Sequence, residues 1–173
     1  MDFHAAELTR GQAAETCGWR YPGKCAAYNS PDWQTALAQK WDIADDERRS
    51  RYFSAILDGN GVFCGYFRLS PEGGAVTLGL GMKPEYCGRG NGRRVMSLIL
   101  DCFRRNYPGR TLELEVRDWN ARAVACYLRA GFVETARYRK STLLGEDGFL
   151  RMRYDPAGAT PAPSGPAVPY GGK

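Results

Sequence analysis

The sequence predicts an α/β fold built around one mixed sheet, and three observations carry this prediction. Runs rich in β-branched and aromatic residues at 52–57 and 62–69 flank the turn 58–61, a strong hairpin signal. Apolar residues recur at intervals of three and four over 91–106, as on one face of a helix, and alternate with charged residues over 112–116, as on a strand. This order of strands and helices is typical of the α/β class.

The N-terminal third predicts two short helices. Thr9 and Gln12 have the spacing of a capping box, so a helix begins there and ends before Gly18. Ser30 followed by Pro31 predicts the start of a second helix, because proline is tolerated in the first turn. Four aromatic residues of this third either pack in the core or line a substrate pocket: Trp19, Tyr21, Trp33 and Trp41.

The middle of the chain predicts a third strand and a long helix. The turn 71–74 leads to a strand over 75–82, which completes an antiparallel meander with the hairpin. The helix over 91–106 ends at Pro108 and Gly109.

The C-terminal part predicts a strand, a helix and two closing strands. The alternating strand 112–116 has one core face, and a helix over 120–130 stops at Gly131. The segments 132–139 and 149–154 have the composition of strands.

Length and composition predict one domain over residues 1–154 and a flexible tail over 155–173. The chain has 173 residues, 43% of them hydrophobic, and a core of that size needs no metal or disulfide. The tail is almost entirely Pro, Gly, Ala and small polar residues, which bury too little apolar surface to fold. No leader-like segment or membrane-length apolar run occurs, so we expect a cytoplasmic protein without a membrane partner.

The cysteines and the charges argue against two further kinds of site. Six cysteines occur singly beside one histidine, so we expect no metal site. The net charge of +5 is spread along the chain, so we expect no nucleic-acid partner. An anionic small ligand explains the basic cluster at 89–94 as well as a nucleic acid would.

The segment after the third strand predicts an anion site. Gly88, Gly90 and Gly92 alternate just before the long helix, so the backbone can approach a phosphate closely and turn its N–H groups toward it. Arg89 and Arg93 add positive charge. The segment lacks the Gly-Lys-Ser/Thr end of a Walker loop and the acidic partner of a dinucleotide fingerprint, so a pyrophosphate cradle fits best. The alternative is a glycine-rich turn that only caps the helix.

Two motifs resemble the GCN5-related N-acetyltransferase (GNAT) superfamily. PEYCGRGNGRRV resembles its acetyl-CoA loop, with Cys87 in place of the usual Arg or Gln. The stretch LEVRDWNARAVACYLRAGF resembles the next motif of the superfamily. The matching residues of that second motif are Asn120, Ala123, Tyr127, Gly131 and Phe132. The resemblance implies a GNAT-like mixed, mostly antiparallel central sheet with helices on both faces, and acetyl-CoA as co-substrate.

The resemblance also implies the cofactor site. The third strand should splay from the next strand, so that the pantetheine arm binds like an added strand and a backbone N–H near Met82 polarises the thioester. The residues expected to bind acetyl-CoA are Leu80, Gly81, Met82, Gly88, Arg89, Gly90, Asn91, Gly92, Arg93 and Asn120.

Two catalytic roles follow from similarity to ribosomal-protein alanine N-acetyltransferases. That similarity makes Glu115 the base that takes a proton from the amine and Tyr127 the acid that protonates the leaving thiolate. Glu113 shares a strand face with Glu115, so either residue, or water, could be the base. A packing role for Tyr127 and an acyl-cysteine route through Cys87 or Cys126 are the alternatives.

The predicted function is therefore transfer of an acetyl group from acetyl-CoA to a primary amine, by direct attack in a ternary complex. The N-terminal string CGWRYPGKCAAYN resembles another branch of the superfamily, so the acceptor does not carry over. A protein N-terminus, a lysine side chain and a small amine stay open as acceptors, in a monomer or a homodimer. The alternative function is a non-catalytic module that binds or senses acyl-CoA, and a nucleic-acid-binding domain is the weaker third alternative.

Overall fold

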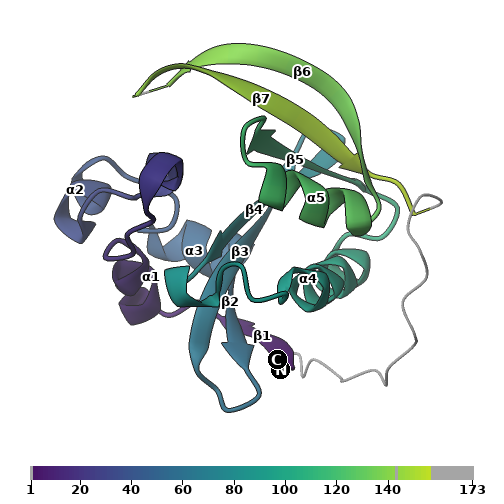
Figure 1. Cartoon of the computed structure of the whole chain (residues 1–173). Coiled ribbons are helices and arrows are strands. Elements are labelled where there is room, and N and C mark those ends of the chain that lie inside the picture. The colour runs from purple at the N-terminus through teal and green to yellow at the C-terminus, as the bar shows by residue number, and fades with distance from the viewer. Residues whose placement is uncertain (1, 143, 157–173) are drawn as a thin grey trace.

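A computed structural model describes residues 2–142 and 144–156 of the chain, and its centre is a seven-stranded sheet (Figure 1). The strands are β1 (Phe3–Glu7), β2 (Phe53–Asp58), β3 (Phe63–Glu72), β4 (Ala75–Met82), β5 (Thr111–Arg117), β6 (Phe132–Thr142) and β7 (Gly145–Tyr154). The α-helices are α1 (Arg10–Thr16), α2 (Trp33–Ala38), α3 (Asp46–Tyr52), α4 (Gly92–Asn106) and α5 (Ala121–Arg129), and the two 3-10 helices are η1 (Gly23–Tyr28) and η2 (Pro84–Tyr86).

The sheet is mixed and mostly antiparallel, with strand order β1-β2-β3-β4-β5-β7-β6. β4 and β5 form the parallel pair, and their register joins Ala75–Leu78 to Thr111–Leu114. Beyond Leu78 and Leu114 the two strands diverge. We call the space between 79–82 of β4 and 115–117 of β5 the split.

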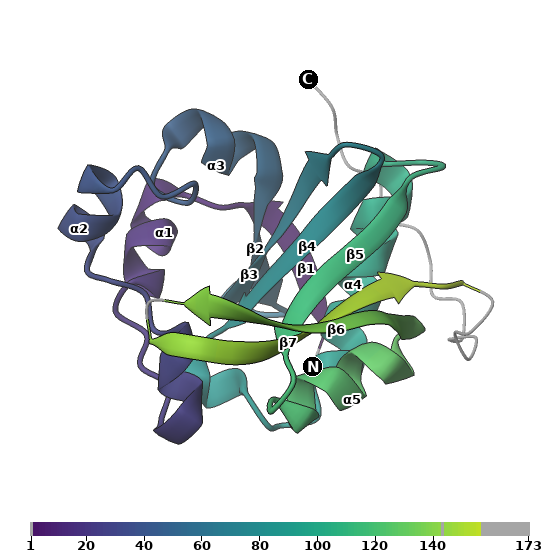
Figure 2. The ribbon, with the colours of Figure 1, turned by 90° about the horizontal axis from the view of Figure 1, so that it is seen from above.

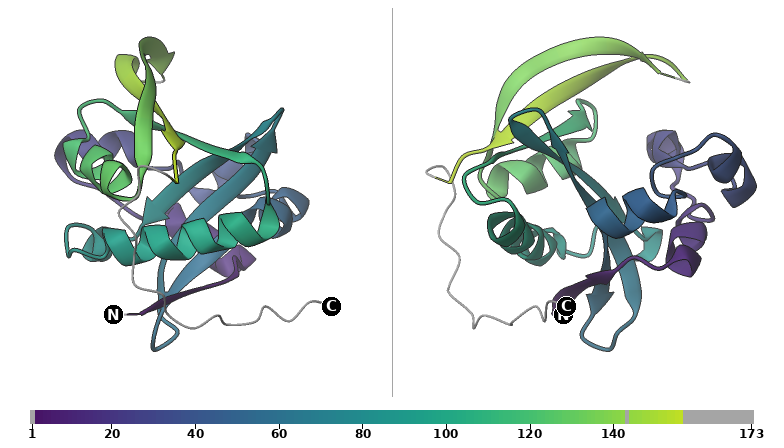
Figure 3. Two further views of the ribbon diagram at one scale, coloured as in Figure 1. Left: turned by 90° about the vertical axis from the view of Figure 1, so that its right-hand side faces the viewer. Right: turned by 180° about the vertical axis from the view of Figure 1, so that it is seen from behind.

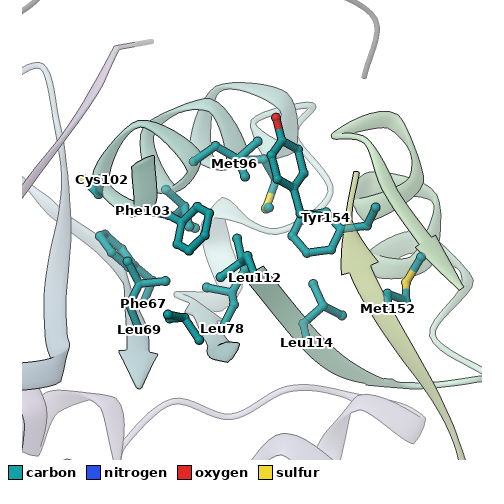
Figure 4. Packing of buried hydrophobic residues seen from close by; sticks show 14 of the residues in the cluster. Phe67, Leu69, Leu78, Met96, Cys102, Phe103, Leu112, Leu114, Met152 and Tyr154 are labelled. Carbon is teal, nitrogen blue, oxygen red and sulfur yellow. The ribbon is translucent and has the colours of Figure 1, made fainter. Parts of the chain in front are cut away.

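Helices cover both faces of the sheet, as expected. Figures 2 and 3 show α4 and α5 on one face and α1 to α3 on the other. The larger core lies under α4, where Val95, Ile99 and Phe103 pack against Leu78 and Leu112 of the sheet. Figure 4 shows Phe103, Leu78 and Leu112 in this core. Leu78 and Leu114, the last paired residues of β4 and β5, also belong to it, so the core holds the two strands at the point where they part.

A second core lies on the opposite face, between the N-terminal helices and strands β2 and β3. Trp19 is 6% exposed there and packs with Phe63, while Trp33 and Trp41 pack against the same core. The core alternative is therefore correct for the three tryptophans.

The predicted elements are present, and their ends depend on local capping. Thr9 and Gln12 form the predicted capping box of α1. The second helix begins at Trp33 rather than after Ser30, because the Asp32 carboxylate accepts the Thr35 N–H at 3.0 Å and so caps the helix.

The sequence prediction missed β1 and α3, which lack a clear apolar period. β1 is an edge strand of sequence FHAAE, and α3 has the sequence DERRSRY with Arg49 as its one buried residue. Across the described ranges, no helix is long and apolar enough to cross a membrane. The predicted tail falls outside these ranges from residue 157 onward.

Candidate functional site

The β4 side of the split presents backbone groups of Leu80 and Met82. The Lys83 N–H donates to the Cys64 carbonyl of β3 at 2.8 Å, so the carbonyl of the same peptide, that of Met82, points away from β3 and into the split. Leu80 lies two residues earlier on the same strand and has the same orientation. Both backbone groups of Leu80 and the Met82 N–H therefore face the split, while the Met82 carbonyl accepts a hydrogen bond from the Tyr21 hydroxyl at 2.7 Å.

Gly81 has a different role from its two neighbours. Its backbone points to β3, where it is paired with Tyr66. A Cβ at Gly81 would lie 2.5 Å from Cε1 of the Tyr66 ring. Glycine is required at this position because the Tyr66 ring occupies the space that a side chain would need.

The loop 87–91 joins η2 to α4 and turns at two glycines. Gly88 and Gly90 both have φ of +74°, a conformation that residues with a Cβ rarely adopt. The loop ends at the N-terminus of α4, whose first N–H groups and helix dipole favour an anion. Arg89 and Arg93 are exposed, and neither forms an ion pair with any residue that the structure describes.

A further arginine reaches this loop from α5, and the sequence analysis did not single it out. The Arg122 guanidinium lies 3.8 Å from the position that a Cβ on Gly88 would take, and its positive charge acts to lower the pKa of the Cys87 thiol. Arg122 stands two residues after the motif residue Asn120, but nothing in the spacing shows that α5 starts beside the glycine loop. The positive charge of the loop is therefore larger than the sequence alone suggested.

Gly92 and Cys126 mark the contact between α4 and α5. A Cβ at Gly92 would lie 2.6 Å from the Cys126 sulfur. Gly92 thus lets the two helices approach closely, and its predicted contact with the cofactor stays a prediction. Burial raises the pKa of both the Cys87 and the Cys126 thiols, so neither is an activated nucleophile.

Tyr127 is half-buried on α5, and its ring packs on Phe132 with centroids 5.9 Å apart. Burial, and to a lesser extent the neighbouring Cys126 and Tyr28, raises the pKa of Tyr127 far above its usual value. Its hydroxyl has no hydrogen-bond partner among the described residues. Tyr127 therefore combines the packing role with a hydroxyl that keeps its proton and is free to donate it.

Glu115 and Glu113 share one face of β5 but occupy different positions relative to the split. Glu113 lies in the paired part of β5, opposite Thr77, and forms an ion pair with Arg153 at 2.8 Å. Glu115 is the first residue beyond that part, and its carboxylate accepts hydrogen bonds from Tyr138 and Lys140 of β6. Burial raises the pKa of Glu115, but these two hydrogen bonds outweigh it, so the pKa is lowered and the group is ionised.

The segment 21–28, which contains η1, spans the two sides of the split. The Tyr21 hydroxyl donates to the Met82 carbonyl at 2.7 Å, and Nδ2 of Asn120 donates to the Tyr28 hydroxyl at 3.0 Å. Asn120 also caps α5, because its Oδ1 accepts the Ala123 N–H at 3.3 Å. We call this segment the bridge. Sequence reasoning considered Tyr21 as a pocket residue and missed Tyr28.

Asn91, a predicted cofactor residue, contacts the segment just before the loop. Nδ2 of Asn91 donates to the Tyr86 carbonyl at 3.5 Å and so holds the loop to η2. No group of three or more His, Cys, Asp or Glu side chains that could hold a metal occurs in the described part of the chain.

A protein-family model of the acetyltransferase (GNAT) family matches residues 15–132 of the chain. No curated protein sequence matches the chain. Among solved structures, a dodecameric spermidine N-acetyltransferase from Vibrio cholerae is 17% identical, with a TM-score of 0.67 over 88% of this chain and 92% of that one. The ribosomal-protein-S18-alanine N-acetyltransferase from Escherichia coli is 20% identical, with a TM-score of 0.61 over 88% of this chain and 92% of that one. At these identities the structures share the fold.

Proposed function

Because this chain belongs to the acetyltransferase (GNAT) family, we propose that it transfers an acetyl group from acetyl-CoA to a primary amine. Acetyl-CoA and the amine are bound together, and the amine attacks the thioester directly. The six cysteines are all free, which supports a reducing compartment such as the cytoplasm as the place of work.

The split carries this proposal. Pairing between β4 and β5 stops at Leu78 and Leu114. The backbone groups of Leu80 and the N–H of Met82 suit an extended chain with amide groups, such as pantetheine. The glycine loop and the start of α4 lie directly beyond β4, so the pyrophosphate of the same ligand would meet backbone N–H groups and arginines. One linear cofactor thus fits both features at once.

The chemistry needs a base, an oxyanion partner and an acid. Glu115, ionised and at the start of the split, would take a proton from the ammonium directly or through water. A backbone N–H of Leu80 or Met82 would bind the oxygen that becomes negative when the amine attacks. Tyr127 would then give its proton to the departing sulfur as the carbon–sulfur bond breaks. The Glu115 carboxylate already accepts a hydrogen bond from Lys140. To act as the base, it would have to bind the substrate ammonium or a water molecule while it stays paired with Lys140.

A module that binds acyl-CoA without turnover is the second candidate. It would use the same split and loop but needs no proton donor. The hydroxyl of Tyr127 distinguishes the two candidates, because only the enzyme needs it as a proton donor.

The test is to incubate the purified protein with acetyl-CoA and panels of peptides and small amines, while free thiol is followed. Amine-dependent thiol release with an acetylated product is expected. Protection of the fold by acetyl-CoA without any release would support the binding module instead, and a lack of both would contradict the cofactor assignment.

A further inference from the structure

A cavity of about 330 Å³ opens beside the split, on the side of the bridge. Its walls are η1, the end of β5 with the residues that follow it, and the tip of the β6–β7 hairpin. The residues that matter for its chemistry are Lys24, Arg117, Trp119, Glu146 and Asp147.

Arg117 is the buried charge of this cavity, with 9% of its surface exposed. Its guanidinium carbon lies 5.7 Å from the Tyr28 ring centre, 5.9 Å from that of Trp119 and 5.1 Å from that of Phe149. These rings hold the guanidinium in one orientation. Nη1 of Arg117 pairs with Asp147, and the described residues offer no acceptor to its other two nitrogens.

The acidic side chains of the cavity are already compensated. Asp147 accepts hydrogen bonds from the Trp119 indole at 3.1 Å and from the Gly148 N–H at 2.9 Å, in addition to its pair with Arg117. Glu146 forms an ion pair with Arg139 at 3.4 Å. A cationic ligand would find no carboxylate here without an existing partner.

Lys24 leaves the cavity with an uncompensated positive charge. It lies on η1 at the cavity wall, is exposed, and forms no ion pair within residues 2–142 and 144–156. We call the two guanidinium nitrogens of Arg117 that lack an acceptor its free edge. Lys24 and this free edge both favour an anion, and a further cation in the same space is disfavoured.

The cavity is joined to the elements that carry the proposed reacting groups. Arg117 of its wall lies two residues after Glu115 on β5. Trp119 of its wall packs on Tyr28 with ring centres 5.8 Å apart, and Tyr28 accepts a hydrogen bond from Asn120. Asn120 caps α5, the helix on which Tyr127 lies, so a ligand in the cavity would lie near the start of the helix that carries the proposed acid.

We propose that this cavity is the acceptor site and that it selects primary amines that also carry a carboxylate, which Lys24 and the free edge of Arg117 bind. The inference rests on the proposed function and narrows it: anionic amines are acetylated in preference to neutral amines and to polyamines.

The test compares matched acceptors in the thiol-release assay. Amino acids with a terminal amine separated from the carboxylate by two to six carbons are paired with the corresponding amides, and spermidine serves as the cationic acceptor. In the longer pairs the acid and its amide have similar amine pKa values, so a difference in kcat/KM between them reports recognition of the carboxylate. We expect kcat/KM at least about tenfold higher for the best acid than for its amide.

Charge reversal at Lys24 sharpens the test, because this exposed residue has no role in folding that the structure describes. Lys24→Glu should raise KM for the acids about tenfold, so the preference for acids over amides falls by a similar factor. Lys40→Glu, an equal change in net charge on an exposed residue at the end of α2, should leave KM unaltered. Arg117→Lys, which keeps the charge but loses the planar fork, should also raise KM for the acids.

The outcomes separate the two claims. Equal use of acids and amides, a preference for spermidine, or an unchanged KM in Lys24→Glu would overturn the acceptor inference while transfer itself stands. Binding of acetyl-CoA with no transfer to any acceptor would contradict both.

Discussion

The cofactor side of the candidate site comes from one continuous stretch of chain, from β4 through α4 to the start of α5. The acceptor side joins η1, the end of β5 and the β6–β7 hairpin, which are far apart in sequence. The first is anchored in the main core under α4, while the second is held by side-chain contacts such as Tyr21 to Met82 and Tyr28 to Asn120. Changes on the cofactor side should therefore affect turnover or folding, and changes on the acceptor side should affect specificity.

Tyr127→Phe should have the largest effect. The variant keeps the ring that packs on Phe132 and removes the proton that would go to the thiolate. We expect kcat to fall about a hundredfold to ten-thousandfold, with acetyl-CoA affinity nearly unchanged. Steady-state kinetics and a direct binding titration measure the two quantities. Full kcat between pH 6 and 9 would make Tyr127 a packing residue only.

Glu115→Gln should change turnover in a pH-dependent way. Without the carboxylate, turnover depends on the amine that is already neutral, so the loss should be greatest at low pH and shrink as the pH rises. Glu113→Gln, on the same face but in the paired part of β5, is the matched control. A flat and undiminished profile for Glu115→Gln would place the base elsewhere.

Gly92→Ala tests the contact between α4 and α5. Its Cβ would meet the Cys126 sulfur, so we expect a loss of about 1–2 kcal/mol in the free energy of unfolding. The loss should shrink in a Cys126→Ala background. Gly90→Ala is the control, because a Cβ there meets open space and its strain comes from the backbone, independent of Cys126. Urea unfolding of the four proteins of the cycle gives the coupling, and additive losses would rule the contact out.

Tyr21→Phe and Tyr28→Phe test the bridge. Each removes one hydrogen bond and should cost about 0.5–1.5 kcal/mol of stability while raising KM for the acceptor. Tyr107→Phe is a matched control, because its hydroxyl donates to the Leu69 carbonyl at 3.1 Å on the α4 side of the sheet. The control should lose similar stability without a kinetic change. If all three variants behave alike in kinetics, the bridge does not shape the acceptor site.

The pH dependence of stability should show the smallest effect, at Glu115. Its pKa is lower in the folded state, so its contribution is present above the unfolded pKa of about 4.3 and disappears as the pH falls through the folded pKa. The carboxylate is one-third exposed, so screening keeps the effect small. Glu115→Gln and Lys140→Met should both flatten this acid-side loss in thermal unfolding. A loss that stays as steep as in the parent protein would contradict the pairing.

The sequence predicted the cofactor side of the candidate site better than the acceptor side. The glycine loop, α4, Tyr127 and Glu115 were predicted because each depends on local spacing or on a motif. Arg122 beside Gly88, the bond from Tyr21 to Met82 and the Arg117 cavity depend on contacts between distant segments, which spacing does not encode. β1 and α3 were missed for a related reason: tertiary packing rather than an apolar period of their own holds them in place.

The central claim is that acetyl-CoA lies in the split with its pyrophosphate at the glycine loop, and residue-resolved amide hydrogen exchange with and without CoA tests it most directly. Bound CoA should slow exchange at Leu80, Met82 and the first turn of α4, while amides of α2 and of the hairpin 58–61 stay unchanged. Saturating CoA that leaves Leu80 and Met82 unprotected, or protects another part of the sheet instead, would contradict the account.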